Sequence, residues 1–86
     1  MRVIVRLFSI VRESCGTERL ELELKPDATL GDAVEALRAR FPEAEVLSTP
    51  MAEGGLLLAL NRRHARPDEP VAEGDEIALF PPVSGG

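Results

Sequence analysis

The sequence has little of what several kinds of site require. It contains no tryptophan or tyrosine, one cysteine and one histidine, so no internal disulfide is possible and no cluster of soft metal ligands is expected. No apolar run approaches the ~20 residues of a transmembrane helix. Met1–Ile4 leads directly into an alternating pattern without an apolar leader segment. These absences predict a cytoplasmic protein that binds no metal or cofactor itself.

Charge and length narrow the class further. Fifteen acidic against ten basic residues give a formal net charge of −5, which argues against nucleic-acid or membrane partners, because basic patches supply affinity for both. The balance suits a partner with a basic face, and it equally suits a domain charged for solubility. Eighty-six residues with 44% apolar and 29% charged content predict one globular domain with one modest core.

Two alternating runs near the start predict paired strands. Residues 2–8 alternate with a period of two, which places Val3, Val5 and Leu7 on one face. The opposite face would carry Arg2, Ile4, Arg6 and Phe8. A similar run, residues 19–24, follows a turn expected over residues 13–17. The two runs predict a hairpin in which Arg2 or Arg6 faces the glutamates of the second strand.

A helix is predicted from about Leu30 to Arg40. Thr29 and Asp32 have the spacing of a capping box, and Pro42 follows the last turn. An apolar stripe recurs at helical spacing and would pack on the sheet: Leu30, Ala33, Val34, Leu37 and Phe41. The polar residues expected in solvent are Asp32, Glu35, Arg38 and Arg40.

The second half of the chain predicts further strands. Residues 42–55 contain two prolines and two glycines and are expected to form a loop. Residues 56–60 are a continuous apolar run of strand length, and residues 62–65 are expected to form a short edge strand. The last strand, residues 76–80, should bury Ile77 and Leu79. Together these elements predict an α+β fold, a mixed sheet of four to five strands with one main helix packed across it.

The sequence closes on Phe80-Pro81-Pro82-Val83-Ser84-Gly85-Gly86. Two prolines remove ladder donors and fix an extended φ, so the last strand cannot continue. Residues 81–86 are therefore expected to form a stiff arm that reaches roughly 18 Å from the body, at ~3.1 Å per residue. Two residues without side chains would let the Gly86 carboxylate enter a narrow channel.

This ending, with Glu73-Gly74-Asp75-Glu76 before it, closely resembles the small-subunit family of molybdopterin synthase, whose members are ubiquitin-like sulfur carriers. Val11-Arg12-Glu13 and Gly16-Thr17 also resemble that family. The resemblance implies a ubiquitin-like β-grasp body over residues 1–80, with its first and last strands parallel neighbours, and an extended Gly-Gly tail over residues 81–86.

The resemblance also implies a mechanism and its partners. An E1-like adenylyltransferase would use ATP to adenylate the Gly86 carboxylate, and a sulfur donor protein would convert it to a thiocarboxylate. The tail would then enter the large subunit and give its sulfur to a cyclic pterin precursor in molybdenum cofactor biosynthesis. The chain would thus be a non-autonomous subunit of a sulfurtransferase, in a family whose usual assembly is a heterotetramer of two small and two large subunits.

The site residues follow from this interpretation. Gly86 would carry the reaction, and the residues threaded into the partner would be Gly85, Ser84, Val83, Pro82 and Pro81. Phe8 and Phe80 would lie together on the sheet face away from the helix and form an apolar contact patch. His64 would lie at the same interface, although the family tends to be apolar near this position.

Other functions remain open from the sequence. A sulfur carrier for thiamine synthesis or tRNA thiolation, or a ubiquitin-like protein modifier, would share the β-grasp body and the Gly-Gly end. A non-catalytic β-grasp interaction module would share the body alone. Cys15, beside Gly16, is expected to pack passively in a turn rather than carry a persulfide.

Overall fold

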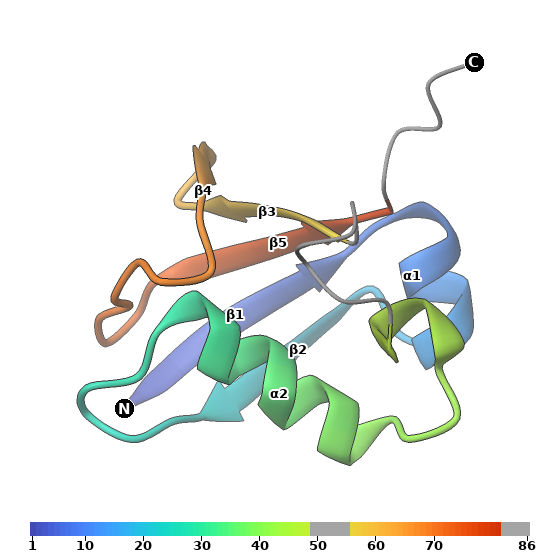
Figure 1. Ribbon diagram of the computed structural model, residues 1–86, viewed down its shortest axis with the longest axis horizontal. Coiled ribbons are helices and arrows are strands. Elements are labelled where there is room, and N and C mark those ends of the chain that lie inside the picture. The colour runs from blue at the N-terminus through green and yellow to red at the C-terminus, as the bar shows by residue number, and fades with distance from the viewer. Residues whose placement is uncertain (49–55, 82–86) are drawn as a thin grey trace.

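A computed structural model describes residues 1–48 and 56–81 as one sheet with helices on one side of it (Figure 1). The main helix, α2 (Leu30–Arg40), lies across one face of the sheet. A short helix, α1 (Ser9–Cys15), and a 3-10 helix, η1 (Glu45–Ser48), lie side by side at one end.

The sheet has five strands in the order β2-β1-β5-β3-β4. β1 (Arg2–Leu7) and β5 (Glu76–Phe80) run parallel, as expected of the first and last strands. β2 (Arg19–Glu23) pairs antiparallel with β1, and β3 (Leu57–Leu60) pairs antiparallel with β5. The predicted edge strand is β4 (Arg63–Ala65), on the outer side of β3. The α+β prediction is therefore confirmed.

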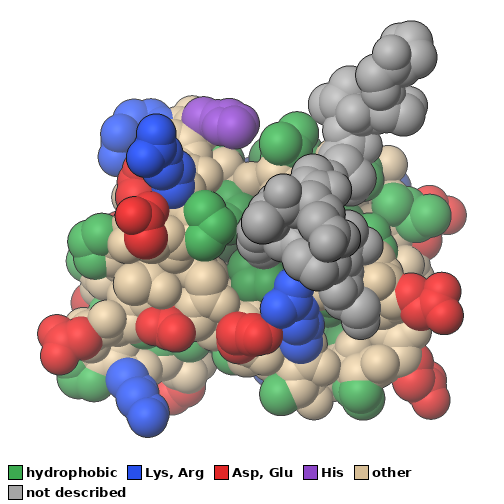
Figure 2. Space-filling view, viewed as in Figure 1, with side chains coloured by type: hydrophobic (Ala, Val, Ile, Leu, Met, Phe, Trp, Pro, Cys, Tyr) green, Lys and Arg blue, Asp and Glu red, His purple; other side chains and the backbone are tan. Residues whose placement is uncertain are grey.

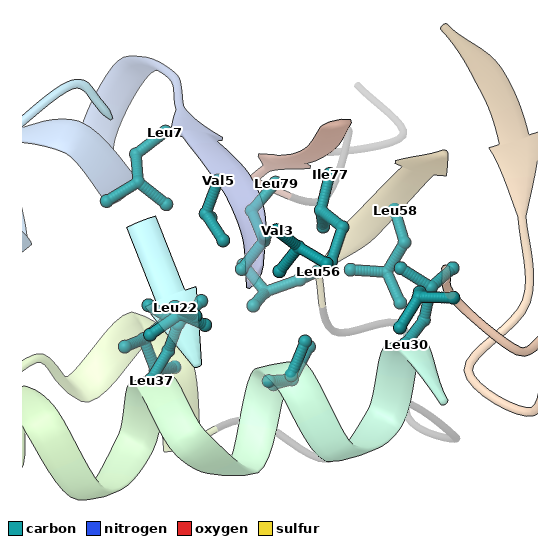
Figure 3. Packing of buried hydrophobic residues seen from close by; sticks show 14 of the residues in the cluster. Val3, Val5, Leu7, Leu22, Leu30, Leu37, Leu56, Leu58, Ile77 and Leu79 are labelled. Carbon is teal, nitrogen blue, oxygen red and sulfur yellow. The ribbon is translucent and has the colours of Figure 1, made fainter. Parts of the chain in front are cut away.

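The core fills the space between the sheet and α2 (Figure 3). The two central strands contribute fully buried side chains: Val3, Val5, Leu7, Ile77 and Leu79. The predicted stripe of α2 contributes Leu30, Ala33, Val34 and Leu37. Burial of each large aliphatic side chain contributes about 1.5–3 kcal/mol, so this interface dominates the stability of the domain.

The helix α2 begins at Leu30 and ends at Arg40, as the sequence predicts. The Asp32 amide donates to the Thr29 hydroxyl at 3.2 Å, and the Thr29 amide donates to the Asp32 carboxylate at 2.9 Å, which completes the capping box. Arg38 differs from the prediction because it is only partly in solvent. Its guanidinium pairs with Glu35 at 2.8 Å and donates to the Leu47 carbonyl, so it ties α2 to η1.

Two elements depart from the sequence prediction. Residues 13–17 are not a hairpin turn, because α1 occupies most of the connection between β1 and β2. Gly16 does adopt a positive φ of 74°, but as the C-cap of α1, with its amide donating to the Arg12 carbonyl at 2.9 Å. Part of the expected loop is η1, which buries Leu47. Residues 49–55 lie outside the described residues.

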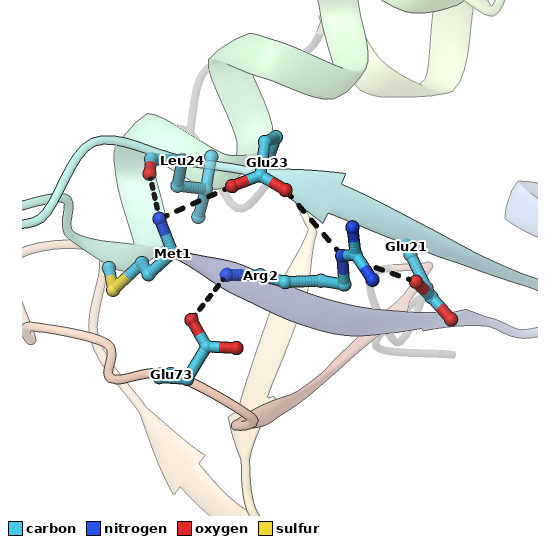
Figure 4. Close-up of polar contacts among 6 residues, drawn as sticks. All are labelled: Met1, Arg2, Glu21, Glu23, Leu24 and Glu73. Carbon is cyan, nitrogen blue, oxygen red and sulfur yellow. Dashed lines mark hydrogen bonds and ion pairs between the residues drawn. The ribbon is translucent and has the colours of Figure 1, made fainter.

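Polar contacts hold the N-terminal end of β1 against its neighbours (Figure 4). As predicted, Arg2 faces the glutamates of β2, with its Nε 3.5 Å from both Glu21 and Glu23. The Arg2 amide donates to the Glu73 carboxylate at 2.8 Å. These groups are mostly exposed, so each ion pair contributes less than about 1 kcal/mol.

A two-residue turn joins β3 to β4. Asn61 and Arg62 have φ values of 51° and 69°, the pattern of a type I′ turn. The Asn61 side chain fixes the turn: its Nδ2 donates to Asp75 at 3.1 Å, and its Oδ1 accepts the Glu76 amide at 3.0 Å. This turn is thereby bound to the start of the central strand β5.

Replacing Leu37 by alanine is expected to lower the free energy of unfolding by about 2–5 kcal/mol, because the side chain is fully buried between α2 and the sheet. Arg40→Ala, on the exposed side of the same helix, is the control; it removes only an exposed contact with the Phe41 ring and should lower the free energy of unfolding by less than about 1 kcal/mol. Urea unfolding monitored by circular dichroism measures both. Similar losses for the two variants would contradict the packing described.

Candidate functional site

A stacked pair of phenylalanines marks the sheet face away from α2. The parallel register pairs Leu7 with Leu79, so the next residue of each strand, Phe8 and Phe80, meets the other. Their ring centroids are 4.6 Å apart with an interplanar angle of 10°. Both side chains are half-buried. The predicted juxtaposition is confirmed, and Phe80 directly precedes Pro81, the first residue of the predicted tail.

Beside this pair lies a shallow cavity of about 410 Å³ over β3 and β5. It is hollow because Ala59 and Ala78, which are cross-strand partners, form a floor of small side chains. We call it the phenylalanine groove; its apolar lining consists of Phe8, Phe80, Leu57, Leu58, Ala59 and Ala78. A concave apolar surface with aromatic side chains on its rim is typical of a protein contact site.

His64 lies where the interface prediction needs it. It is exposed on β4, opposite Ala59, and lines the phenylalanine groove from the edge of the sheet. Figure 2 shows the histidine, coloured purple, at the margin of the molecule. Its participation in binding remains a prediction, as does that of Phe8 and Phe80.

Sequence reasoning missed one residue of this surface, Leu57, and one exposed hydrophobic residue elsewhere, Ile10. Leu57 is half-buried opposite Phe80, but the run of residues 56–60 does not alternate and therefore gave no sign of its orientation. Ile10 is 52% exposed, the only large hydrophobic side chain so exposed within residues 1–48 and 56–81. It lies on α1, a helix that the sequence analysis did not predict.

The tail is described only at its base. Pro81 is half-buried and lies outside β5, in agreement with the prediction that the strand stops at the prolines. The threading roles of Gly86, Gly85, Ser84, Val83 and Pro82 concern positions outside the described residues and remain predictions. The same holds for the division into a body of residues 1–80 and a tail of residues 81–86.

Within the described part of the chain, no three His, Cys, Asp or Glu side chains gather in a way that would hold a metal ion. No helix there is long and apolar enough to cross a membrane. Cys15 ends α1 and packs half-buried against the core, rather than lying in a turn. Burial raises the pKa of its thiol, which does not favour a nucleophilic role.

Comparison with known proteins decides the family. Residues 5–86 match the ThiS family. The chain belongs to the ThiS family. The small archaeal modifier protein 1 of Haloferax volcanii is 38% identical over 86 residues, covering 94% of this chain and 97% of that protein. Its crystal structure matches with a TM-score of 0.85 over 100% of both chains, at 34% identity.

Other ThiS-family relatives bear on the function. The molybdopterin synthase sulfur carrier subunit of Escherichia coli is 37% identical over 83 residues, covering 95% of this chain and 96% of that protein. A complex of subunits 1 and 2 of the molybdopterin-converting factor from Helicobacter pylori contains a chain that matches at 30% identity, with a TM-score of 0.55 and full coverage of both chains. These relatives support the sulfur-carrier interpretation and the ubiquitin-like β-grasp fold of the sequence analysis.

Because burial raises the pKa of the Cys15 thiol, iodoacetamide should alkylate the folded protein more slowly than the urea-unfolded chain, with a higher pH midpoint. The raised pKa gives the folded state a stability contribution that is complete below the unfolded pKa and is lost as pH rises through the folded one. Cys15 is the only thiol, so mass spectrometry of the intact chain measures the rate. Equal midpoints in the two states would contradict the burial of this thiol.

Proposed function

We propose that this protein is the sulfur carrier subunit of a molybdopterin synthase, with the Gly86 carboxylate as its reactive group. The observation that supports this most is the stacked Phe8–Phe80 pair, which puts an apolar contact surface at the base of a tail that ends in Gly85-Gly86. A carrier of this kind needs its docking surface next to the point at which the reactive C-terminal segment leaves the domain.

The chemistry requires help from partners. A carboxylate is a poor electrophile, so an E1-like adenylyltransferase must first join it to AMP at the expense of ATP, with release of pyrophosphate. The terminal sulfur of a persulfide on the donor protein then displaces AMP, and a thiol cleaves the S–S bond of the resulting acyl disulfide, which leaves a thiocarboxylate at Gly86 and a disulfide on the donor side. Like a thiolate, the anionic sulfur is a soft nucleophile suited to attack an activated carbon of a cyclic pterin precursor.

The body of the protein serves this reaction by binding rather than by catalysis. The large subunit would supply the pterin pocket and the acid–base groups, and the phenylalanine groove would dock on it. Pro81 and Pro82 would reduce the entropy lost when the tail is threaded, because proline restricts the free chain. We infer a heterotetramer of two small and two large subunits in the cytoplasm, where a lone free cysteine remains reduced.

Deleting Gly86 should abolish sulfur transfer, because the remaining chain would present its carboxylate one residue short of the reaction centre. Transfer is measured as molybdopterin formed by the reconstituted synthase from the thiocarboxylated carrier. The control Arg40→Ala, remote from the tail, should retain wild-type transfer. The deleted chain should keep the wild-type circular dichroism spectrum and unfolding midpoint, and full transfer by it would overturn the proposed function.

Replacing Phe80 by arginine should weaken binding to the large subunit by about 2–4 kcal/mol, as for a central aromatic anchor. Ala39→Arg is the matched control, because it adds the same charge on the exposed side of α2. Isothermal titration calorimetry compares the two variants with the wild type. Wild-type affinity for the Phe80 variant would exclude the phenylalanine groove from the interface.

A second candidate function is protein modification, favoured by the 38% identity to the small archaeal modifier protein 1. A modifier would use the same activated Gly86 carboxylate to form an isopeptide bond with a lysine of another protein. Mass analysis of the protein from its native host separates the two functions. A rise in the mass of the free chain that corresponds to one oxygen replaced by sulfur indicates a carrier. Attachment of the chain to lysines of other proteins indicates a modifier.

A further inference from the structure

Next to the phenylalanine groove, one row of residues across the sheet begins with two arginines and ends in a histidine. From β2 to β4 its members are successive cross-strand partners: Arg19, Arg6, Ala78, Ala59 and His64. The next row, farther from the tail, carries Glu21 and Glu76 on either side of Ile4. The sheet face therefore changes sign along its strands, and the arginines lie on the side nearer the tail.

Arg6 and Arg19 lie directly opposite each other, an arrangement that destabilises a strand pair. Within residues 1–48 and 56–81 neither guanidinium forms an ion pair. Arg6 lies instead over the Phe8 ring, 5.4 Å from its centroid. Glu21 does not neutralise this pair, because it is engaged by Arg2. The two arginines thus carry positive charge that no ion pair in the described part of the chain neutralises.

The surroundings do not remove this charge. A cavity of about 410 Å³ beside Phe8 is lined by Arg6, Arg12 and Arg19 together with Glu18 and Glu76. The ion pair that forms there joins Arg12 to Glu18 and is long, at 3.9 Å. Three guanidinium groups therefore face two carboxylates.

Arg62 points to the same conclusion from the opposite edge of the groove. It occupies the second position of the type I′ turn with a φ of 69°, where glycine is strongly preferred and a long side chain is strained. The asparagine that precedes it already fixes the turn. Arg62 lines the phenylalanine groove. A strained backbone conformation at a residue that the turn does not require indicates that the side chain of this residue has a function.

We propose that Arg6 and Arg62, which line the phenylalanine groove, and Arg19, which lines the adjoining cavity, pair with carboxylates on the protein that docks onto the groove. We call these three residues the arginine rim. This inference rests on the proposed function, because it takes the large subunit as the occupant. Guanidinium groups around an apolar centre fit a protein surface on which acidic side chains surround an apolar one. A nucleic acid fits less well, because Glu76 lines the same groove and would face its phosphates.

The local charge differs from the charge of the whole chain. The net charge of −5 suits a partner with a basic face or a domain charged for solubility, whereas the arginine rim would select an acidic partner surface. Net charge is a sum over the whole surface, but a partner responds to the charges that it approaches.

The double variant Arg6→Glu/Arg19→Glu tests the rim. Its Kd for the purified large subunit should rise about tenfold or more, chiefly because association is slower. The association rate of the double variant should also no longer fall as salt is added. Arg40→Glu is the control for a charge reversal elsewhere, because Arg40 lies on α2, on the other face of the sheet. This variant should bind the large subunit as the wild type does. Stopped-flow association at several salt concentrations measures all three proteins.

The outcomes separate the two proposals. A wild-type protein that does not bind the large subunit overturns the proposed function and the rim with it. Wild-type binding that the double variant retains, with the same salt dependence, overturns the rim alone. Retardation of single-stranded DNA by the wild type but not by the double variant also overturns it, since the arginines would then recognise phosphates.

Arg62→Gly provides an independent test, because strain and binding should change in opposite directions. Its Tm should rise by about 4 °C or more, while its Kd for the large subunit should increase about fivefold. Arg62→Lys keeps both the charge and the strain, and it should leave Tm and the salt dependence of association near the wild-type values. A higher Tm with unchanged Kd in the glycine variant overturns the assignment of Arg62 to the rim.

Discussion

The parallel pairing of β1 with β5 is the constraint on which the rest of the structure depends. It joins the first strand to the last, and on its inner side it aligns Val5 with Ile77 and Leu7 with Leu79 under α2. On its outer side the same register brings Phe8 to Phe80. One alignment of two strands therefore sets both the core and the contact surface, and a slip by one residue would turn each set of side chains to the wrong face.

Most of the body could be predicted from the sequence because its signals are local and strong. The capping box at Thr29 and the apolar stripe of α2 both lie within the helix sequence, so they indicate a helix and its buried face without knowledge of the rest of the fold. α1 could not be predicted, because it is short and its N-cap, Phe8, makes no side-chain hydrogen bond. The orientation of Leu57 was also hidden, since a run of leucines has the same polarity on both faces of a strand.

In the candidate site, too, some features could be predicted from the sequence, whereas others depend on contacts between residues that are distant in the sequence. Phe8 and Phe80 could be paired from the sequence once the two strands were taken as parallel neighbours. The opposition of Arg6 and Arg19 requires the register between β1 and β2, and the contribution of Arg62 requires the conformation of a turn. The grouping of these arginines on one face is thus a property of the folded arrangement, which the net charge of the chain does not reveal.

The position of β5 has a mechanical consequence. It is the only strand of the described sheet joined directly to the C-terminal tail, and it is hydrogen-bonded on both sides, to β1 and to β3. A pull on the tail along the strand loads both ladders in shear, so that many hydrogen bonds must break together instead of one after another. A force on the end of the chain is therefore borne by a strand that is hydrogen-bonded on both sides rather than by an edge strand.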